Sequence, residues 1–342
     1  MQNMTTVAQL EAKLAEPTEA LIQDLSTVEG DIVILGVGGK MGPSLARLAA
    51  NAVREGGLHK RVIGVSRFSN AEARRELEEA GVETISCDLL NDSALQELPV
   101  AANVIYMAGN KFGTTGREHF TWAMNAYLPG RVAEHYKDSR IVVFSSGNIY
   151  PFASVLQGGG ADEKTSPEPI GEYAQSCLGR ERIFEYHAHK NGTPMAMYRL
   201  NYAIDMRYGV LLELARAVRE QRPVDVTMGH ANVIWQGDAN SVALRCLTIC
   251  STPPSVLNVT GPETLSIRWA AEQFAERFGV EPIFAGAESD HALLSNASRS
   301  HQRFGYPSAS LLQMIDWTAE WVAADGPTWN KPTHFQERKG KF

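Results

Sequence analysis

The sequence predicts an α/β fold built on a doubly wound parallel sheet, and three observations predict it. Short apolar strands alternate with helical patterns through the first half of the chain. A glycine-rich turn joins the first of these strands to the following helix. The length of 342 residues is enough for about two domains around a large core. In such a sheet, ligands are expected at the carboxyl ends of the strands.

The chain begins with a helical extension over residues 1–30, where apolar residues recur at helical spacing. The first strand of the sheet is predicted over 31–35, and a helix follows from residue 43. Between them lie Gly36, Gly39 and Gly42. Glycines with this spacing let a pyrophosphate approach the backbone N–H groups at a helix N-terminus, whereas a Cβ would block the turn or the approach. The alternative is an ordinary glycine-rich loop.

The second strand, over 61–65, ends in Ser66 and Arg67, at the place where a dinucleotide-binding domain contacts the adenosine ribose. No acidic residue ends this strand. An Asp or Glu would accept hydrogen bonds from a ribose 2′-hydroxyl, whereas Arg67 and Ser66 favour a 2′-phosphate. We therefore expect NADP(H), with NAD as the alternative cofactor. Lys40 is a weaker second candidate for the phosphate, and Arg67 could instead be a solvated surface charge.

Three more strands follow with helices between them, over 82–86, 102–107 and 141–144. The fifth strand leads into the stretch SSGNIY, residues 145–150, and Tyr173 follows after a glycine-rich loop over 157–163. That loop has the composition either of a mobile lid or of a plain surface loop.

These motifs together resemble those of the extended short-chain dehydrogenase/reductases, the NAD(P)-dependent epimerase/dehydratase family. The shared motifs are the glycine turn, Asp88-Leu89, Ala108-Gly109, Asn125, the SSxxxY stretch, the YxxxK position and Arg199-Leu-Asn201. The resemblance implies a Rossmann-type fold, with 31–202 as the NAD(P)-binding domain and 203–342 as a smaller region that completes the sheet and caps the substrate. The cofactor-binding positions it implies are Gly36, Gly39, Lys40, Met41, Gly42, Ser66, Arg67, Asp88, Leu89, Ala108 and Gly109.

The resemblance also implies a catalytic group with one unusual member. Ser146 aligns with the residue that holds the substrate oxygen, and Tyr173 with the acid/base. Cys177 stands where the family has the lysine that lowers the tyrosine pKa. A cation about 4 Å away at an effective dielectric near 20 contributes about 4 kcal/mol, or roughly three pK units. Arg180, on the same helix face, or Lys111 could replace that cation, and Cys177 could be only a small apolar filler.

The expected reaction is alcohol/ketone oxidoreduction or epimerisation, because the run after Ser146 lacks the acid and base that dehydratases of the family carry. Nucleotide-sugar enzymes of the family usually place an arginine just before the position of Asp238, and residues 228–238 contain none. A small, sugar-like substrate without a nucleotide is therefore expected, which places the protein in carbohydrate metabolism. The alternative is a catalytically impaired NADPH-binding sensor or scaffold. By analogy with the family, the helices around 118–137 and 172–188 are expected to pair in a homodimer.

Composition narrows the partners further. Lys and Arg total 32 and Asp and Glu total 39, a net charge of −7. Nucleic acid is not expected, because binding it needs clustered positive charge. The four cysteines lack paired spacing, so neither a disulfide framework nor a metal site is expected. Such sparse cysteines predict a cytoplasmic location. No apolar run approaches the roughly 20 residues of a membrane helix, so no membrane partner is expected.

Overall fold

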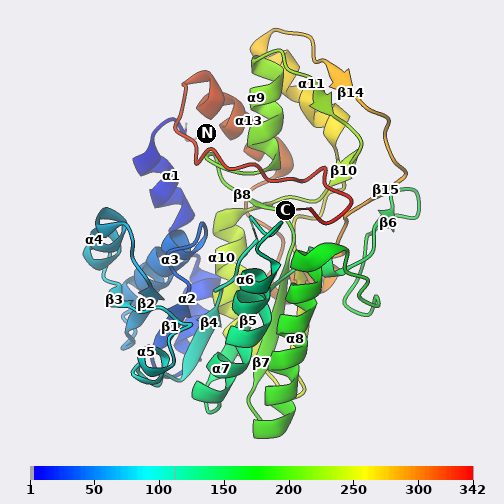
Figure 1. Cartoon of the computed structure of the whole chain (residues 1–342). Coiled ribbons are helices and arrows are strands. Elements are labelled where there is room, and N and C mark those ends of the chain that lie inside the picture. The colour runs from blue at the N-terminus through cyan, green and yellow to red at the C-terminus, as the bar shows by residue number, and fades with distance from the viewer. Residues whose placement is uncertain (1–3, 112, 342) are drawn as a thin grey trace.

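The computed structural model describes residues 4–111 and 113–341, and its centre is a seven-stranded parallel sheet (Figure 1). The strand order is β3-β2-β1-β4-β5-β7-β12. The strands are β1 (Ile32–Leu35), β2 (Val62–Ser66), β3 (Glu83–Ser86), β4 (Asn103–Tyr106), β5 (Arg140–Ser146), β7 (Met195–Leu200) and β12 (Ser255–Val259). The predicted doubly wound parallel sheet is confirmed, and the five predicted strands are its first five.

Helices cover both faces of the sheet, because successive residues of a strand point to opposite faces and both sets are buried in the central strands β1 and β4. In β1, Ile32 and Ile34 pack on one face with helices α2, α3 and α10, while Val33 and Leu35 pack on the other with α5, α7 and α8. The bounds are α2 (Glu19–Ser26), α3 (Gly42–Glu55), α4 (Ala71–Glu79), α5 (Asp92–Gln96), α6 (Glu118–Trp122), α7 (Leu128–His135), α8 (Gly171–Asn191) and α10 (Gln236–Arg245). A π-helical turn, Ala123–Tyr127, joins α6 to α7.

The N-terminal extension forms two helices that belong to different cores. Helix α1 (Val7–Leu14) starts at a capping box formed by Thr6 and Gln9, and its buried Leu10 and Leu14 join the core of the C-terminal region. Helix α2 packs on the sheet. Between the two cores, Glu11 accepts hydrogen bonds from Arg47 of α3 and Arg207 of the C-terminal region. The extension therefore ties the two parts of the molecule together.

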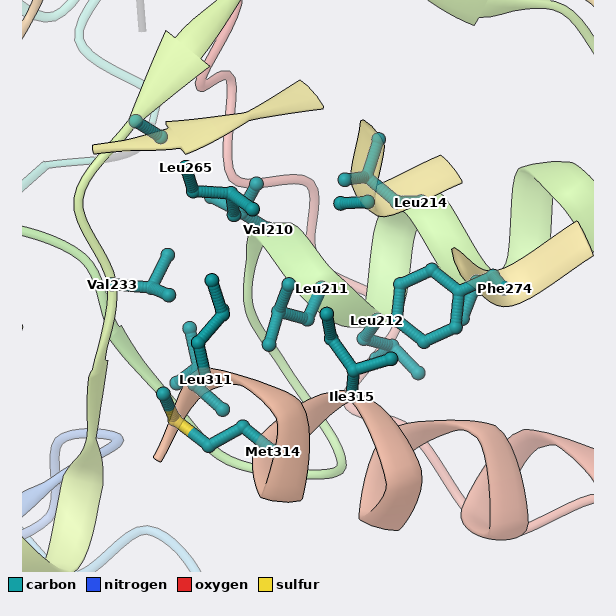
Figure 2. Packing of buried hydrophobic residues seen from close by; sticks show 14 of the residues in the cluster. Val210, Leu211, Leu212, Leu214, Val233, Leu265, Phe274, Leu311, Met314 and Ile315 are labelled. Carbon is teal, nitrogen blue, oxygen red and sulfur yellow. The ribbon is translucent and has the colours of Figure 1, made fainter. Parts of the chain in front are cut away.

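The cap consists of the part of 203–326 that lies beyond the sheet, and it has an apolar core of its own. Helices α9 (Val210–Arg219), α11 (Ile267–Phe278) and α13 (Leu311–Ala323) surround this core, and Figure 2 shows Leu211, Phe274 and Ile315 meeting inside it. Four two-stranded pairs border it: β6 (Ala153–Ser154) with β15 (His291–Ala292), β8 (Ala203–Ile204) with β11 (Ile234–Trp235), β9 (Val224–Asp225) with β14 (Phe284–Ala285), and β10 (His230–Ala231) with β13 (Leu265–Ser266). Helix α12 (Ser298–Phe304) lies beside β12.

The C-terminal segment, residues 327–341, has no helix or strand and runs between the cap and the sheet layer (Figure 1, red). It reaches the start of α8, where a Cβ on Gly171 would lie 2.4 Å from the carbonyl oxygen of Gly340. Within the described ranges, no helix is long and apolar enough to cross a bilayer.

Candidate active site

The glycine turn has the geometry of a phosphate cradle. Gly36 has a φ of +91°, and a Cβ there would lie 2.7 Å from the backbone nitrogen of Ala108 at the end of β4. A Cβ on Gly42 would lie 2.1 Å from the carbonyl oxygen of Val37. Helix α3 begins after Met41 with no side-chain cap, so the N–H groups of Gly42 and Ser44 in its first turn face no capping side chain, while Pro43 has no N–H. These features fit the pyrophosphate of a dinucleotide.

The end of β2, where the sequence predicts the adenosine ribose, lies next to the glycine turn. A Cβ on Gly38 would lie 2.4 Å from the hydroxyl of Ser66, so the end of β2 lies directly against the turn. Arg67 is exposed, and its side chain forms no ion pair within the described part of the chain. Asp88 is exposed and accepts a hydrogen bond from the backbone of Leu90, while Leu89 is buried.

Lys40 does not lie at this corner. Its ammonium is 3.2 Å from the centroid of the Tyr208 ring, which belongs to the cap side. The turn thus directs the Lys40 side chain toward the cap, and its role beside Arg67 at a 2′-phosphate stays a prediction. Met41 of the same turn lines the cavity described next.

A cavity of about 550 Å³ opens at the carboxyl ends of β1, β4, β5 and β7, between the sheet and the cap. Its walls include the glycine turn, the residues after β4, the serine motif, Tyr173, and parts of the cap and C-terminal segment: Gly36, Gly38, Gly39, Lys40, Met41, Met107, Gly109, Asn110, Lys111, Phe144, Ser145, Ser146, Asn148, Tyr173, Leu200, Asn201, Tyr202, Ala203, Tyr208, Gly209, Val210, Gln236, Lys331 and Thr333. The predicted glycine turn, Ser146 and Tyr173 thus meet in one space, whereas Cys177 does not line it.

Ser146 and Tyr173 lie side by side in this cavity. The Tyr173 hydroxyl is hydrogen-bonded to Ser146 and to Cys177. The Ser146 hydroxyl also accepts hydrogen bonds from the backbone nitrogen of Asn148 at 3.1 Å and from its side-chain nitrogen at 3.2 Å. Burial and the neighbouring Cys177 thiol raise the pKa of Tyr173 well above its usual value, while Ser146 and Arg180 act to lower it.

The comparison with protein families decides the classification. The model of the NAD dependent epimerase/dehydratase family matches residues 32–223. The chain belongs to this family. Its members are enzymes of the extended short-chain dehydrogenase/reductase type that use a nicotinamide dinucleotide.

Solved structures with the same fold are distant in sequence. A UDP-glucuronic acid 4-epimerase from Bacillus cereus in complex with NAD is 17% identical, with a TM-score of 0.69 over 86% of this chain and 98% of that one. A UDP-glucose 4-epimerase from Thermus thermophilus in complex with NAD is 18% identical, with a TM-score of 0.68 over 86% and 99%. Pal from Bacillus thuringiensis is 16% identical, with a TM-score of 0.70 over 86% and 99%. No curated protein matches the chain.

Cys177 occupies the family's lysine position and is fully buried, packed against Tyr173, Ile149 and Tyr150. Burial raises the pKa of the Cys177 thiol, an effect that Arg180 opposes. At neutral pH the thiol is therefore protonated and brings no charge to Tyr173.

Arg180 lies behind Cys177, one turn further along α8, and is almost fully buried. Its Nη1 donates to the carbonyl oxygen of Phe144 and its Nη2 to Oδ1 of Asn125, both at 2.7 Å. A Cβ on Gly109 would lie 2.5 Å from Nη2, so a glycine at that position leaves room for the guanidinium. Its positive charge lowers the pKa of both Tyr173 and Cys177 against the effect of burial. The structure thus brings one of the two predicted substitutes for the lysine next to the tyrosine.

Lys111 is the other predicted substitute, and it also reaches the tyrosine. Its ammonium lies 5.7 Å from the centroid of the Tyr173 ring. Burial lowers the pKa of Lys111 to about 8. Two cations therefore lie near Tyr173 where the family has one lysine.

Asn125 connects these groups to the backbone beside the cofactor site. From the π-helical turn, its Oδ1 accepts from the backbone nitrogen of Asn110 at 2.8 Å, and its Nδ2 donates to the Asn110 oxygen and the Ser176 hydroxyl. It thereby fixes the chain after β4.

A buried polar network beneath the serine motif was not predicted from the sequence. The Glu181 carboxylate accepts from the Ser145 hydroxyl at 2.5 Å and from two nitrogens of Arg199 at 2.9 and 2.7 Å. Arg199 also donates to the Tyr150 hydroxyl, which donates to Asn258. The sequence identified Arg199 only as part of a motif and did not predict its pairing with Glu181. A charged residue within an otherwise apolar strand could have indicated a buried partner, because buried charges are paired.

The loop over 157–163 does not line the cavity. It is docked on the cap, because the backbone nitrogen of Ala161 donates to Leu294 and that of Asn296 donates to Ala161. Of the two alternatives left open for this loop, the structure favours a surface loop.

Proposed function

We propose that the protein is an NADP(H)-dependent oxidoreductase or epimerase that acts on the alcohol or ketone of a small sugar-like substrate. The observation that carries the proposal is the hydrogen-bonded pair of Ser146 and Tyr173 in the wall of the cavity that begins at the glycine turn. Ser146 orients the substrate oxygen, and Tyr173 exchanges a proton with it at the phenol oxygen. When bound, the nicotinamide supplies or takes up the hydride.

Arg180 and Lys111 replace the missing lysine in this proposal. Arg180 is charged at every pH of interest, and the favourable effect of its charge on Tyr173 is opposed by burial. Lys111 adds a second charge while the pH stays below about 8. Cys177 is smaller than a lysine and its thiol is neutral. It therefore adds no further positive charge beside the buried Arg180.

The preference for NADP(H) rests on the end of β2. Ser66 lies against the glycine turn, and the next residue, Arg67, is exposed. Neither residue is acidic. An arginine accepts a ribose 2′-phosphate through charge-assisted hydrogen bonds, whereas a carboxylate would repel it.

A substrate without a nucleotide is supported by the size of the cavity. About 550 Å³ is within the range of roughly 300–1,000 Å³ for small-molecule sites, and this space must hold the reacting end of the cofactor as well. An arginine does reach the segment 228–238, from the C-terminal segment. Arg338 donates to the Met228 sulfur and to the carbonyl oxygen of His291 at 2.9 Å, but it does not line the cavity. Because this arginine lies near the segment where nucleotide-sugar enzymes of the family carry one, binding tests of the substrate should include UDP as a competitor.

The alternative is a protein that binds the cofactor without turnover, and the raised pKa of Tyr173 beside a neutral Cys177 favours it. Titration with NADPH and with NADH, followed by turnover on a panel of sugars and sugar acids, separates the two functions. We expect NADPH-selective binding, turnover, and loss of turnover in Tyr173→Phe with unchanged cofactor affinity. Binding without any turnover, together with a large gain of activity in Cys177→Lys, would support the alternative.

A homodimer is part of the same proposal. Three aromatic side chains are exposed on helices α6 and α8 and on the turn between α6 and α7: Trp122 at 37%, Tyr127 at 58% and Tyr186 at 61%. Aromatic side chains are enriched in protein interfaces, and these three lie on elements that contact each other.

A further inference from the structure

The active-site cavity has a charge opposite to that of the chain as a whole. Lys40, Lys111 and Lys331 line it, and none of its described lining residues is an Asp or a Glu. The chain carries a net charge of −7. Three lysines in the lining of one cavity of an acidic protein need a specific reason, and an anionic ligand, which would stabilise their protonated forms, supplies one.

Lys331 is held at the mouth of the cavity by contacts on both sides of it. Two residues before it, the backbone nitrogen of Trp329 donates to the Arg207 oxygen at 3.2 Å. Two residues after it, Thr333 donates to the Glu213 carboxylate through its backbone nitrogen and through its hydroxyl, the latter at 2.8 Å. The C-terminal segment, drawn in red in Figure 1, is thus anchored where it presents Lys331.

Lys40 approaches the same region from the glycine turn, with its ammonium over the Tyr208 ring. Burial, Lys111 and Lys331 together lower the pKa of Lys40 to about 7. Glu213 and Asp205 act in the opposite direction on Lys40, and they also contact Thr333 and Arg207, respectively, each at 2.8 Å. An anion placed between the lysines would relieve their mutual repulsion.

We propose that Lys40 and Lys331 bind an acid group of the substrate, a carboxylate or a phosphate, while Ser146 and Tyr173 act on its alcohol. The inference rests on the function proposed above and names the substrate class as an anionic, sugar-like compound. It assigns Lys40 to the substrate rather than to the cofactor. The pyrophosphate of the cofactor has a separate site, at the uncapped start of α3.

The test measures ligand affinity in the full-length protein saturated with NADP⁺, by calorimetry at constant ionic strength. Three probes of similar length are compared: D-gluconate carries a carboxylate, D-glucose 6-phosphate carries a phosphate, and D-glucitol is neutral. We expect at least one acid to bind about tenfold or more tightly than glucitol. Lys331→Met should remove most of that preference, and Lys40→Met should do the same. Lys190→Met is the matched control, since Lys190 is an exposed lysine paired with Glu134 on the outer surface of α8.

The outcomes separate the inference from the function on which it rests. A preference for one acid identifies the group as a carboxylate or a phosphate. Equal affinities for the three probes, or no binding of either acid, would overturn the inference while NADPH binding stays intact. A loss of NADPH affinity in Lys40→Met and Lys331→Met, with the acid preference unchanged, would overturn it too, because the lysines would then serve the cofactor. Failure of the unmodified protein to bind NADPH would instead remove the proposed function.

Discussion

The buried ion pair between Glu181 and Arg199 makes a sharp prediction about stability. Both side chains are nearly inaccessible, at 4% and 7% exposure, and they are joined by bonds of 2.7 and 2.9 Å. Glu181→Gln keeps the shape of the side chain but leaves the Arg199 charge buried without its counter-charge. Removing one partner of such a pair costs about 3–5 kcal/mol of unfolding free energy. In a chain of this length that corresponds to a fall in Tm of roughly 4–7 °C.

The assay is urea denaturation followed by circular dichroism, with the m-value compared between variants. The matched control is on the same helix, because Arg182 and Glu185 of α8 form an ion pair at 2.8 Å with 56% and 41% exposure. Glu185→Gln should cost less than about 1 kcal/mol, since water and salt screen an exposed pair. In the double variant Glu181→Met/Arg199→Met no charge stays buried, so it should be more stable than Glu181→Gln.

The reasoning would be refuted by equal, small effects in Glu181→Gln and Glu185→Gln. It would also be refuted if Glu181→Met/Arg199→Met were no more stable than Glu181→Gln, because the buried charge would then not be the cause of the destabilisation.

Four further predictions concern the cofactor, the pH dependence of ligand binding and of stability, and the assembly. Arg67→Glu should weaken NADPH binding by about tenfold or more and leave NADH binding nearly unchanged, which parallel fluorescence titrations would show. The preference for an acidic probe should be greatest below pH 7 and fall as the pH rises through about 7 and 8, because Lys40 and Lys111 lose their protons there. The other charged groups that act on these lysines are Lys331, Glu213 and Asp205. A preference that stays constant from pH 6 to pH 9 would contradict the assignment. In the folded protein, the pKa values of Lys40 and Lys111 lie below the usual value of 10.5. Between about pH 7 and 10.5 the unfolded chain therefore binds more protons than the folded one, so the free energy of unfolding rises with pH. Thermal unfolding of Lys40→Met should show a flatter rise. Tyr186→Glu should convert the proposed dimer to monomers in sedimentation experiments, whereas Tyr306→Glu, at an exposed residue stacked on His301 of α12, should not.

Local patterns predicted the site well where one stretch of chain carries all the information. The glycine turn at 36–42 needs only a strand, a turn and a helix in succession, and the structure forms it in the predicted place. The pairing of Ser146 with Tyr173 followed from a family resemblance, and the two residues are in contact. The catalytic and cofactor-binding roles, and the division of the chain at residues 30 and 202, stay predictions.

Side-chain direction was not predictable in the same way. Lys40 is in the turn as expected, but it contacts Tyr208, about 170 residues away in the sequence, so its role depends on where the cap packs. The sequence could name Arg180 and Lys111 only as alternatives. Packing brings both to Tyr173, since α8 and the end of β4 meet there through Asn125.

The sequence by itself determined the parallel sheet, the nicotinamide-dinucleotide class and the absence of the family's lysine, because the spacing of apolar, glycine and motif residues is a property of neighbouring positions. Only the tertiary structure decided what surrounds Tyr173, how Glu181 pairs with Arg199, and that the C-terminal segment brings Lys331 to the cavity. Charge in a buried site acts through space, and the elements that bring these charges together are distant in the chain, so their effect exists only once the fold has formed.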